Sequence, residues 1–276
     1  MYSLLEKIYL SFVIDVHWLR TPRIPDRWKY LLQKYFFLLF PYLYWNKEHN
    51  AYKLKLLNRI VYIPTIEHIT FLQGTYIDHA YLKQYIKPNA VVIDVGAHAG
   101  EFALVCTTLL NAQEIYSFEP LKKIYELLRL NTPYAAYHAA VGTAEHQTLY
   151  IPKNTVASSI FQTSPEDTPE ESHSISLDGM PQITRLPHID LLKIDVEGME
   201  YDVLMASKTA IKKSSYICIE VSMHRPSTKS ALDTLALIKE CVPNIQIVHI
   251  GTIFPFKTGR QVAVDILLHN PAINVL

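Results

Sequence analysis

The sequence lacks the features that identify a disulfide-rich, metal-binding or membrane-spanning protein. It has only three cysteines, Cys106, Cys218 and Cys241, and each lies in an apolar run. None of them has a metal-binding spacing, and no His-x-x-x-His pattern occurs. These cysteines therefore indicate buried thiols in a reducing compartment. A run of about 20 apolar residues, which a membrane-spanning helix needs, is also missing.

The chain has no net charge, and its first residues do not resemble a secretory leader. Its 26 basic side chains balance its 26 acidic ones, so no chain-wide field favours nucleic acid. Residues 8–19 contain Asp15, His17 and Trp18 and precede no small-residue cleavage site, which is not typical of a signal peptide. We therefore expect a cytoplasmic protein. The charge balance is uneven, because residues 1–60 hold ten basic and four acidic side chains.

A third absence concerns glycine. A dinucleotide-binding turn of the Gly-x-Gly-x-x-Gly kind would need glycine where His98 and Glu101 stand, which disfavours a nicotinamide-linked oxidoreductase. What is present is an apolar strand at 91–95, a turn with Gly96 and Gly100, and an apolar helix. Such a turn lets backbone N–H groups and a helix N-terminus approach a ligand that has no pyrophosphate.

Strands and helices alternate along most of the chain. With 276 residues, 49% of them hydrophobic, the chain can form one α/β domain and an extension. Strands are predicted at 91–95, 114–118, 137–141, 189–194, 216–221, 246–250 and 262–269. Helices are predicted at 101–111, 121–131, 199–212 and 227–241, a hairpin at 148–151 and a mobile loop at 163–174. The alternation predicts a doubly wound, mostly parallel sheet with an antiparallel edge.

The first 70 residues form a separate, aromatic-rich and mainly helical extension, and residues 71–276 form the α/β domain. The extension and the segment after it are predicted to contain helices 1–20 and 27–45, short strands at 54–63 and 71–75, and a helix at 77–86. Two interpretations of its aromatic face are open. It packs on the α/β domain or on a second subunit in a homodimer, or its segment 27–45 rests peripherally on the anionic inner face of a membrane.

Acidic side chains follow several of the predicted strands. The titratable candidates are Asp94, Glu119, Asp195, Glu197, Glu220 and, four residues after Glu220, His224. Because ligands gather at the carboxyl ends of parallel strands, we expect these groups to converge on one pocket. An acid that follows a buried apolar run must be paired, hydrogen-bonded or in contact with a ligand. Glu119 either accepts ribose hydroxyls or interacts with the start of a helix.

Six short motifs follow one another at workable spacings. They are Val-Val-Ile-Asp-Val-Gly-Ala-His-Ala-Gly at 91–100, Phe-Glu-Pro at 118–120, Ser-Ser at 158–159, Ser-Leu-Asp at 176–178, Leu-Lys-Ile-Asp-Val-Glu-Gly-Met-Glu at 192–200 and Ile-Glu-Val at 219–221. Together they resemble the FkbM family of S-adenosylmethionine-dependent methyltransferases, over residues 75–268. The Lys-Ile-Asp-Val-Glu-Gly block is the most specific part. His98 departs from the family, which more often has Asn there.

The resemblance implies a class I methyltransferase sheet with strand order 3-2-1-4-5-7-6. It implies that S-adenosylmethionine lies across the turn, with its methionine end near Asp94. The expected cofactor contacts are Asp94, Gly96, Ala97, His98, Gly100, Glu119, Pro120, Ala140 and Val141, with the ribose on Glu119 and the adenine beside Ala140 and Val141. By analogy with the family, the acceptor is a saccharide hydroxyl of a glycan, a glycolipid or a glycosylated natural product.

Methyl transfer to a sugar hydroxyl needs alignment and a means of removing the hydroxyl proton. In the implied strand order, Asp195 and Glu220 stand side by side. Either a carboxylate of Asp195, Glu220 or Glu197, or the imidazole of His224, acts as base, or Asp195 and Glu220 hold Mg²⁺ that binds the acceptor oxygens. The pair could also be purely structural. The alternative function, from another class, is a membrane-associated scaffold that keeps this fold without turnover.

Overall fold

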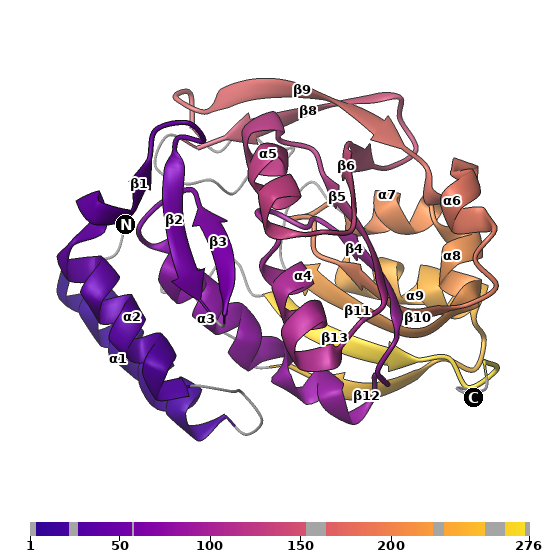
Figure 1. Cartoon of the computed structure of the whole chain (residues 1–276). Coiled ribbons are helices and arrows are strands. Elements are labelled where there is room, and N and C mark those ends of the chain that lie inside the picture. The colour runs from indigo at the N-terminus through magenta and orange to yellow at the C-terminus, as the bar shows by residue number, and fades with distance from the viewer. Residues whose placement is uncertain are drawn as a thin grey trace.

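The computed structural model describes residues 4–21, 27–56, 58–152, 164–222, 229–251 and 263–273. Its central sheet contains the strands β4 (Val91–Val95), β5 (Glu114–Glu119), β6 (Ala135–His138), β10 (Ile189–Ile194), β11 (Ser214–Ser222), β12 (Gln246–Ile250) and β13 (Ala263–His269). They lie in the order β12-β13-β11-β10-β4-β5-β6 (Figure 1). Counted along the chain, this is the order 3-2-1-4-5-7-6, so the predicted fold class is confirmed.

The direction of the strands follows from their connections. β4 pairs in parallel with β5 on one side and β10 on the other, and helical segments connect successive parallel strands. Its Val-Val-Ile run is apolar throughout because such a strand is covered on both faces. β13 runs antiparallel to both β11 and β12, which confirms the predicted antiparallel edge.

The extension contains more strand than the sequence predicted. Its elements are α1 (Leu4–Arg20), α2 (Arg27–Leu39), the 3₁₀ turn η1 (Pro41–Tyr44) and a small antiparallel sheet of β1 (Trp45–Asn46), β2 (Ala51–Leu56) and β3 (Arg59–Ile63). The predicted helix 27–45 therefore ends at Leu39, and Pro41 begins the 3₁₀ turn that follows. None of the helices in the described ranges is long and apolar enough to cross a membrane.

The prediction of a strand at 71–75 is wrong. This stretch belongs to helix α3 (His68–His79). The predicted helix 77–86 is α-helical only at its start, in the last residues of α3, and continues as the 3₁₀ turn η2 (Ala80–Gln84). Ile69, Leu72 and Tyr76 are buried at helical spacing, so one helix face meets the core. The stretch contains β-branched Thr and a glycine, which favoured the wrong period. The expected boundary at 70/71 lies inside α3 and stays a prediction.

A buried polar network ties α1, α2 and α3 together. Lys34 is fully buried, and its Nζ donates to Asp15 Oδ1 at 2.6 Å and to Gln73 Oε1 at 2.8 Å. Trp18, Tyr30 and Phe37 are buried in the same core cluster as residues of the central sheet. Part of the aromatic face therefore packs on the α/β domain, as one interpretation predicted.

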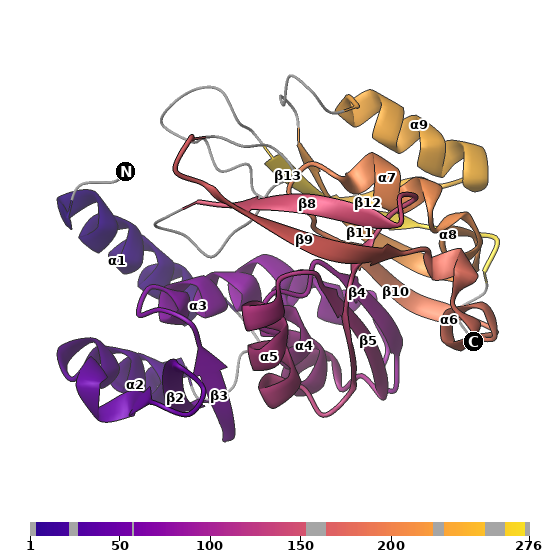
Figure 2. The same ribbon diagram turned by 90° about the horizontal axis from the view of Figure 1, so that it is seen from above.

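Helices cover both faces of the central sheet (Figure 2). Those after β4 are α4 (Glu101–Val105) with the π-helical turn η3 (Cys106–Leu110), α5 (Lys122–Asn131), the 3₁₀ turn η4 (Leu177–Gly179), α6 (Pro181–Thr184), α7 (Glu200–Met205), α8 (Lys208–Lys213) and α9 (Ala231–Cys241). The predicted helix 199–212 is thus two helices. α3 and α4 pack on the face that carries Val92 and Cys218, and α7, α8 and α9 pack on the opposite face.

The prediction of a mobile loop at 163–174 is wrong for most of its length. Residues Thr168–Ile175 form strand β9, which joins β7 (Ala140–Val141) and β8 (His146–Ile151) in a three-stranded sheet. Ser172 and Ser174 are buried on one side of β9, whereas Glu171 and His173 are exposed on the other. This strand is polar on both faces, so its composition resembles that of a loop. Ser158, Ser159 and His224 lie outside the described residues.

Candidate active site

The glycine turn connects β4 to α4 in a left-handed conformation. Gly96 has φ +81° and Gly100 has φ +93°, and the intervening His98 also has a positive φ of +49°. The N–H groups of Gly96 and Ala97 both donate to the carbonyl oxygen of Phe118, at 3.1 and 2.9 Å, which fixes the turn on β5. Histidine and asparagine both tolerate this conformation better than most residues, so His98 fits the position where the family more often has Asn.

Gly96 lies against the backbone of the segment after β10. A Cβ atom at this position would come within 1.8 Å of the Asp195 carbonyl oxygen. The Asp195 N–H donates to the carbonyl oxygen of Val95 at 3.0 Å and holds this segment in place. The absence of a side chain at residue 96 therefore brings Asp195 directly beside the turn.

Glu119 is buried at the end of β5 with both carboxyl oxygens engaged. Its Oε2 accepts from the His98 N–H at 3.0 Å, and its Oε1 accepts from the Leu121 N–H at 2.8 Å. Burial raises the pKa of Glu119 to about 7, although the His98 charge and the two backbone donors oppose the shift. Each carboxyl oxygen has a second lone pair, so the side chain can still accept from a ligand.

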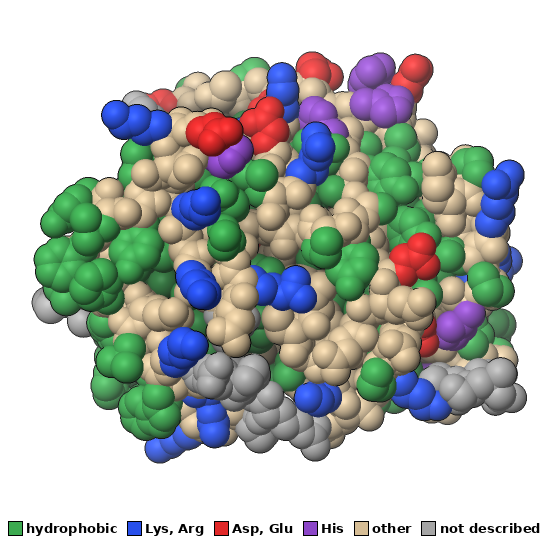
Figure 3. Space-filling view, in the orientation of Figure 1, with side chains coloured by type: hydrophobic (Ala, Val, Ile, Leu, Met, Phe, Trp, Pro, Cys, Tyr) green, Lys and Arg blue, Asp and Glu red, His purple; other side chains and the backbone are tan. Residues whose placement is uncertain are grey.

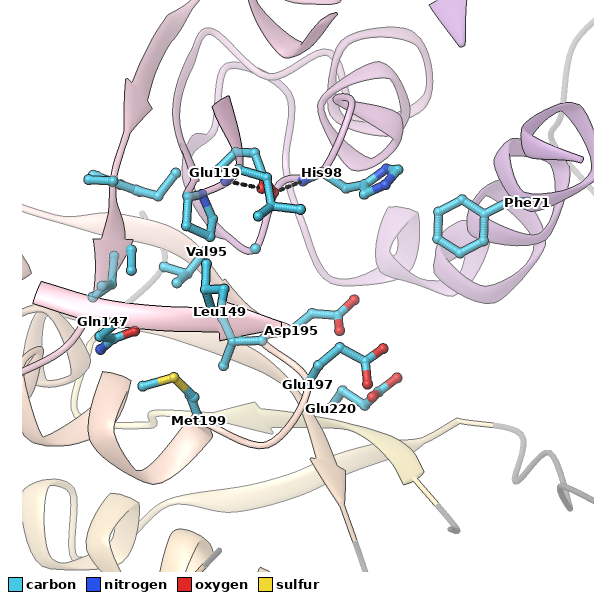
Figure 4. Close-up of a pocket in the computed structure, with 18 of the residues that line it drawn as sticks. Phe71, Val95, His98, Glu119, Gln147, Leu149, Asp195, Glu197, Met199 and Glu220 are labelled. Carbon is cyan, nitrogen blue, oxygen red and sulfur yellow. Dashed lines mark hydrogen bonds between the residues drawn. The ribbon is translucent and has the colours of Figure 1, made fainter. Parts of the chain in front are cut away.

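These groups open onto one cavity of about 360 Å³ (Figure 4). Nine of the predicted site residues line it: Gly96, His98, Glu119, Pro120, Ala140, Val141, Asp195, Glu197 and Glu220. Ala97, Gly100 and Asp94 are not among the lining residues, and His224 is outside the described part of the chain. The structure thus brings together the glycine turn and acids at or near the carboxyl ends of β5, β10 and β11. A contact of Asp94 with the cofactor stays a prediction.

Asp195, Glu197 and Glu220 form an acidic cluster at one end of the cavity. Figure 4 shows their carboxyl groups together, and one oxygen from each lies within 4.8 Å of the others. The negative charge of Asp195, followed by burial and the charge of Glu197, raises the pKa of Glu220 to about 9. The cluster therefore favours the protonated form of Glu220 more than water would for an isolated carboxyl group.

Lys193 is the counter-ion of this region, and the sequence analysis gave it no role. It lies beside Asp94 on the neighbouring strand, with Nζ 3.6 Å from Asp94 Oδ1, and it donates to Asp195 Oδ2 at 3.1 Å. Burial lowers the pKa of Lys193, but the charges of Asp195 and Asp94 together raise it above its usual value. The sequence could have indicated this role, because Lys193 lies inside an apolar strand and a lysine is buried there only when it has a charged or polar partner.

Helix α3 supplies a wall that the sequence did not predict. Glu67, His68 and Phe71 line the cavity, and the His68 ring stacks on His98 with centroids 5.1 Å apart and planes at 2°. His98 Nδ1 lies 3.2 Å from both oxygens of Glu101, which raises the pKa of His98 although burial opposes the shift. The sequence analysis missed this wall because it predicted a strand at 71–75, where the structure has α3.

Asn131, at the end of α5, joins the extension to the glycine turn. Its Nδ2 donates to the carbonyl oxygens of Ala99 at 2.7 Å and Tyr62 at 2.8 Å, and its Oδ1 accepts from the Tyr62 N–H at 2.7 Å. Strand β3 is therefore held against the turn by three hydrogen bonds from one side chain.

Comparison with known proteins agrees with this geometry. The family model described as "Methyltransferase FkbM domain" matches residues 94–245, more than half of the chain. The hexuronic acid methyltransferase AglP of Haloferax volcanii is 23% identical over 204 residues, which cover 72% of this chain and 82% of that protein. The match confirms the resemblance found in the motifs and gives no support to a scaffold without turnover.

Two solved structures are similar in part. The tRNA m1G37 methyltransferase of M. jannaschii has a TM-score of 0.46 and 12% identity, with coverage of 80% of this chain and 55% of that one. The N-terminal domain of EvdMO1, determined in the presence of SAH and D-fucose, has a TM-score of 0.42 and 10% identity, covering 71% of this chain and 82% of that one. At these scores neither indicates the acceptor of this chain.

Proposed function

The chain belongs to the FkbM family of methyltransferases, and from that membership we propose that it transfers the methyl group of S-adenosylmethionine to a saccharide hydroxyl. The saccharide would be part of a glycan, a glycolipid or a glycosylated natural product. The observation that carries the proposal is one cavity with Glu119 beside the glycine turn and a cluster of Asp195, Glu197 and Glu220 beyond it (Figure 4).

The residues that line the cavity support a site for the cofactor. Glu119 would accept the two ribose hydroxyls, and the apolar surface of Ala140, Val141 and Leu149 would contact the adenine. The backbone of the turn at Gly96 and His98 would follow the central part of the molecule. The methionine end and the sulfonium would then lie toward Asp195, whose negative charge favours a cation.

The acidic cluster would remove the proton of the acceptor hydroxyl. The hydroxyl oxygen would bond to the methyl carbon as the carbon–sulfur bond breaks, and the hydroxyl proton would pass to a carboxylate, giving a methyl ether and the demethylated cofactor. Asp195, Glu220 and Glu197 are the candidates for this base, and His224 is a further one. Their oxygens also suit a hard cation such as Mg²⁺, which would lower the pKa of a bound hydroxyl.

The saccharide part of the proposal rests on two supports. The Haloferax relative is named for a hexuronic acid, and it aligns with most of this chain. The acid-lined cavity offers many hydrogen-bond acceptors to a ligand that is rich in hydroxyl groups.

Calorimetry with the demethylated cofactor, S-adenosylhomocysteine, tests the cofactor site. We expect saturable binding by the folded protein, and a dissociation constant raised at least about tenfold in Glu119→Gln, because a charge-assisted bond contributes about 1.5–3 kcal/mol. Glu126→Gln is the matched control, since Glu126 is exposed on α5. Absence of heat from folded wild-type protein at millimolar ligand would contradict the proposal.

We also propose that the exposed aromatic face of α2 and η1 rests on an anionic membrane surface. Trp28, Leu32, Leu39 and Tyr42 are each at least 70% exposed. Figure 3 shows hydrophobic side chains gathered over these elements with Lys and Arg side chains beside them. Large exposed aromatics with basic neighbours are typical of interfacial helices.

Flotation with phosphatidylglycerol-containing vesicles tests this contact. We expect the wild type to float and the double substitution Leu39→Ser, Tyr42→Ser to reduce the floating fraction several-fold, because apolar area drives the insertion. Leu232→Ser is the control, as Leu232 is 78% exposed on α9, away from this face. A homodimer in ultracentrifugation that the double variant dissociates, without flotation, would assign the face to a second subunit instead.

A further inference from the structure

A second cavity, of about 310 Å³, adjoins the candidate cofactor cavity. It lies between the end of α3 with η2, which contribute Asp78 and Tyr81, and strands β11, β12 and β13. Glu220 lines both cavities, so it marks the point at which they meet. Of its acids only Glu220 belongs to a motif, whereas Asp78 precedes the residues matched by the family model and Asp265 follows them.

The second cavity is rich in hydrogen-bond acceptors that the protein does not use. Glu220 and Asp265 are register partners on β11 and β13, and Asp78 reaches the same space from α3. Among the described residues, none of the three carboxyl groups has a hydrogen-bond donor. The oxygens of these partly buried carboxyl groups are therefore available to accept hydrogen bonds from a ligand.

Tyr81 and His249 form part of the wall of the second cavity. The Tyr81 ring stacks on His249 with centroids 3.7 Å apart, and its hydroxyl lies 3.5 Å from Cys218 Sγ. Both rings are thus held in place. No lysine or arginine lines this cavity among the described residues, and the basic groups that act on Asp265 are His249, which lines it, and His79 and Lys193.

The charge of these acids limits what can bind. Burial, followed by the charge of Asp265, raises the pKa of Asp78 to about 7, so a negative charge is unfavourable at this place. A ligand carboxylate or phosphate would add a further like charge at close range. Hydroxyl and ammonium groups, in contrast, donate hydrogen bonds to carboxyl oxygens.

We propose that this second cavity is the acceptor subsite of the transferase proposed above, and that it takes a neutral or amino sugar ring and excludes a uronate. The proposal depends on the proposed function and narrows its substrate class. The reacting hydroxyl would lie at Glu220, where the two cavities meet, with the rest of the ring donating to Asp78 and Asp265. In this respect the chain would differ from the relative that is named for a hexuronic acid.

The test uses full-length protein saturated with S-adenosylhomocysteine. Binding is measured by saturation-transfer NMR for methyl glycosides of the gluco, galacto and manno series, each as the neutral hexose, the 2-amino sugar and the hexuronate. Transfer of labelled methyl groups to the same panel is measured with S-adenosylmethionine. We expect the neutral or amino member of at least one series to bind about tenfold more tightly than its hexuronate.

Asp78→Asn and Asp265→Asn, made separately, should reduce this discrimination to about threefold or less and leave cofactor affinity unchanged. Two variants are used because one of them could fail to fold. Glu240→Gln, an exposed acid on α9, should retain the discrimination. Equal or tighter binding of hexuronates, no binding of any sugar to cofactor-loaded protein, or discrimination that survives both substitutions would overturn the inference. Failure to bind S-adenosylhomocysteine would overturn the proposed function itself and is recognised separately.

Discussion

Gly96→Ala is expected to abolish cofactor binding. The added Cβ would stand 1.8 Å from the carbonyl oxygen of Asp195 and 2.8 Å from its carbonyl carbon, and both are backbone atoms that no rotamer change can move. The residue also has φ +81°, which is unfavourable for alanine. The turn and the segment after β10 would have to separate, so the ends of the cavity would lose their relative position. We expect affinity for S-adenosylhomocysteine to fall at least about 100-fold in calorimetry.

The matched control is Gly74→Ala. Gly74 lies inside α3, its φ is not positive, and the nearest atom to an added Cβ is 3.9 Å away. Alanine in a helix interior should stabilise the protein by about 0.5–1 kcal/mol and leave cofactor binding unchanged. Normal cofactor affinity in Gly96→Ala, with an unchanged melting temperature, would show that the segment after β10 does not contact the turn as described.

Asp195→Asn is expected to remove most turnover while leaving cofactor affinity within about threefold of the wild type. The side chain lies in the acidic cluster, where a carboxylate accepts the hydroxyl proton or holds a cation, and loss of such a group lowers kcat about 10²- to 10⁴-fold. Initial rates with labelled cofactor and calorimetry with S-adenosylhomocysteine separate the two effects. Glu240→Gln serves again as the exposed control.

The same variant makes a pH prediction. The charge of Asp195 is the largest cause of the raised pKa of Glu220, so its removal must lower that pKa from about 9. If residual turnover depends on ionised Glu220, its rise with pH should move to lower pH in Asp195→Asn. Because Lys193 would keep only Asp94 as a partner, thermal melting must accompany the rates. Full turnover in a folded variant would exclude Asp195 from the chemistry.

The parallel strands could be predicted because each is a short apolar run with a distinct end, whereas their order was implied only by the resemblance to the FkbM family. Asp94, Glu119, Asp195 and Glu220 were found for the same reason, since an acid after such a run is costly unless it has a partner. The topology then brings three of them, all but Asp94, to one cavity. The local sequence thus identifies the acids, and the sheet topology brings them together.

Other parts of the site could not be predicted because they depend on distant contacts. Asp78 and Asp265 are separated by most of the chain, and only the packing of α3 on the sheet brings them to one cavity. The helix itself was missed because its buried positions include polar Gln73 and His79, which mask the apolar period. Strand β9 was missed because strand pairing, rather than composition, makes it a strand.

The hydrogen bonds of Asn131 link the glycine turn to Tyr62, which lies outside the residues matched by the family model. A fragment of residues 94–245, the stretch matched by the family model, would lack Tyr62, whose N–H and carbonyl oxygen both bond to the Asn131 side chain. It would also lack the residues of α3 that line the cavity. It would also lose β13, and with it the partner of β11. We therefore expect a fragment of residues 94–245 to be less stable than the whole chain, because it lacks contacts that hold the glycine turn and the edge of the sheet.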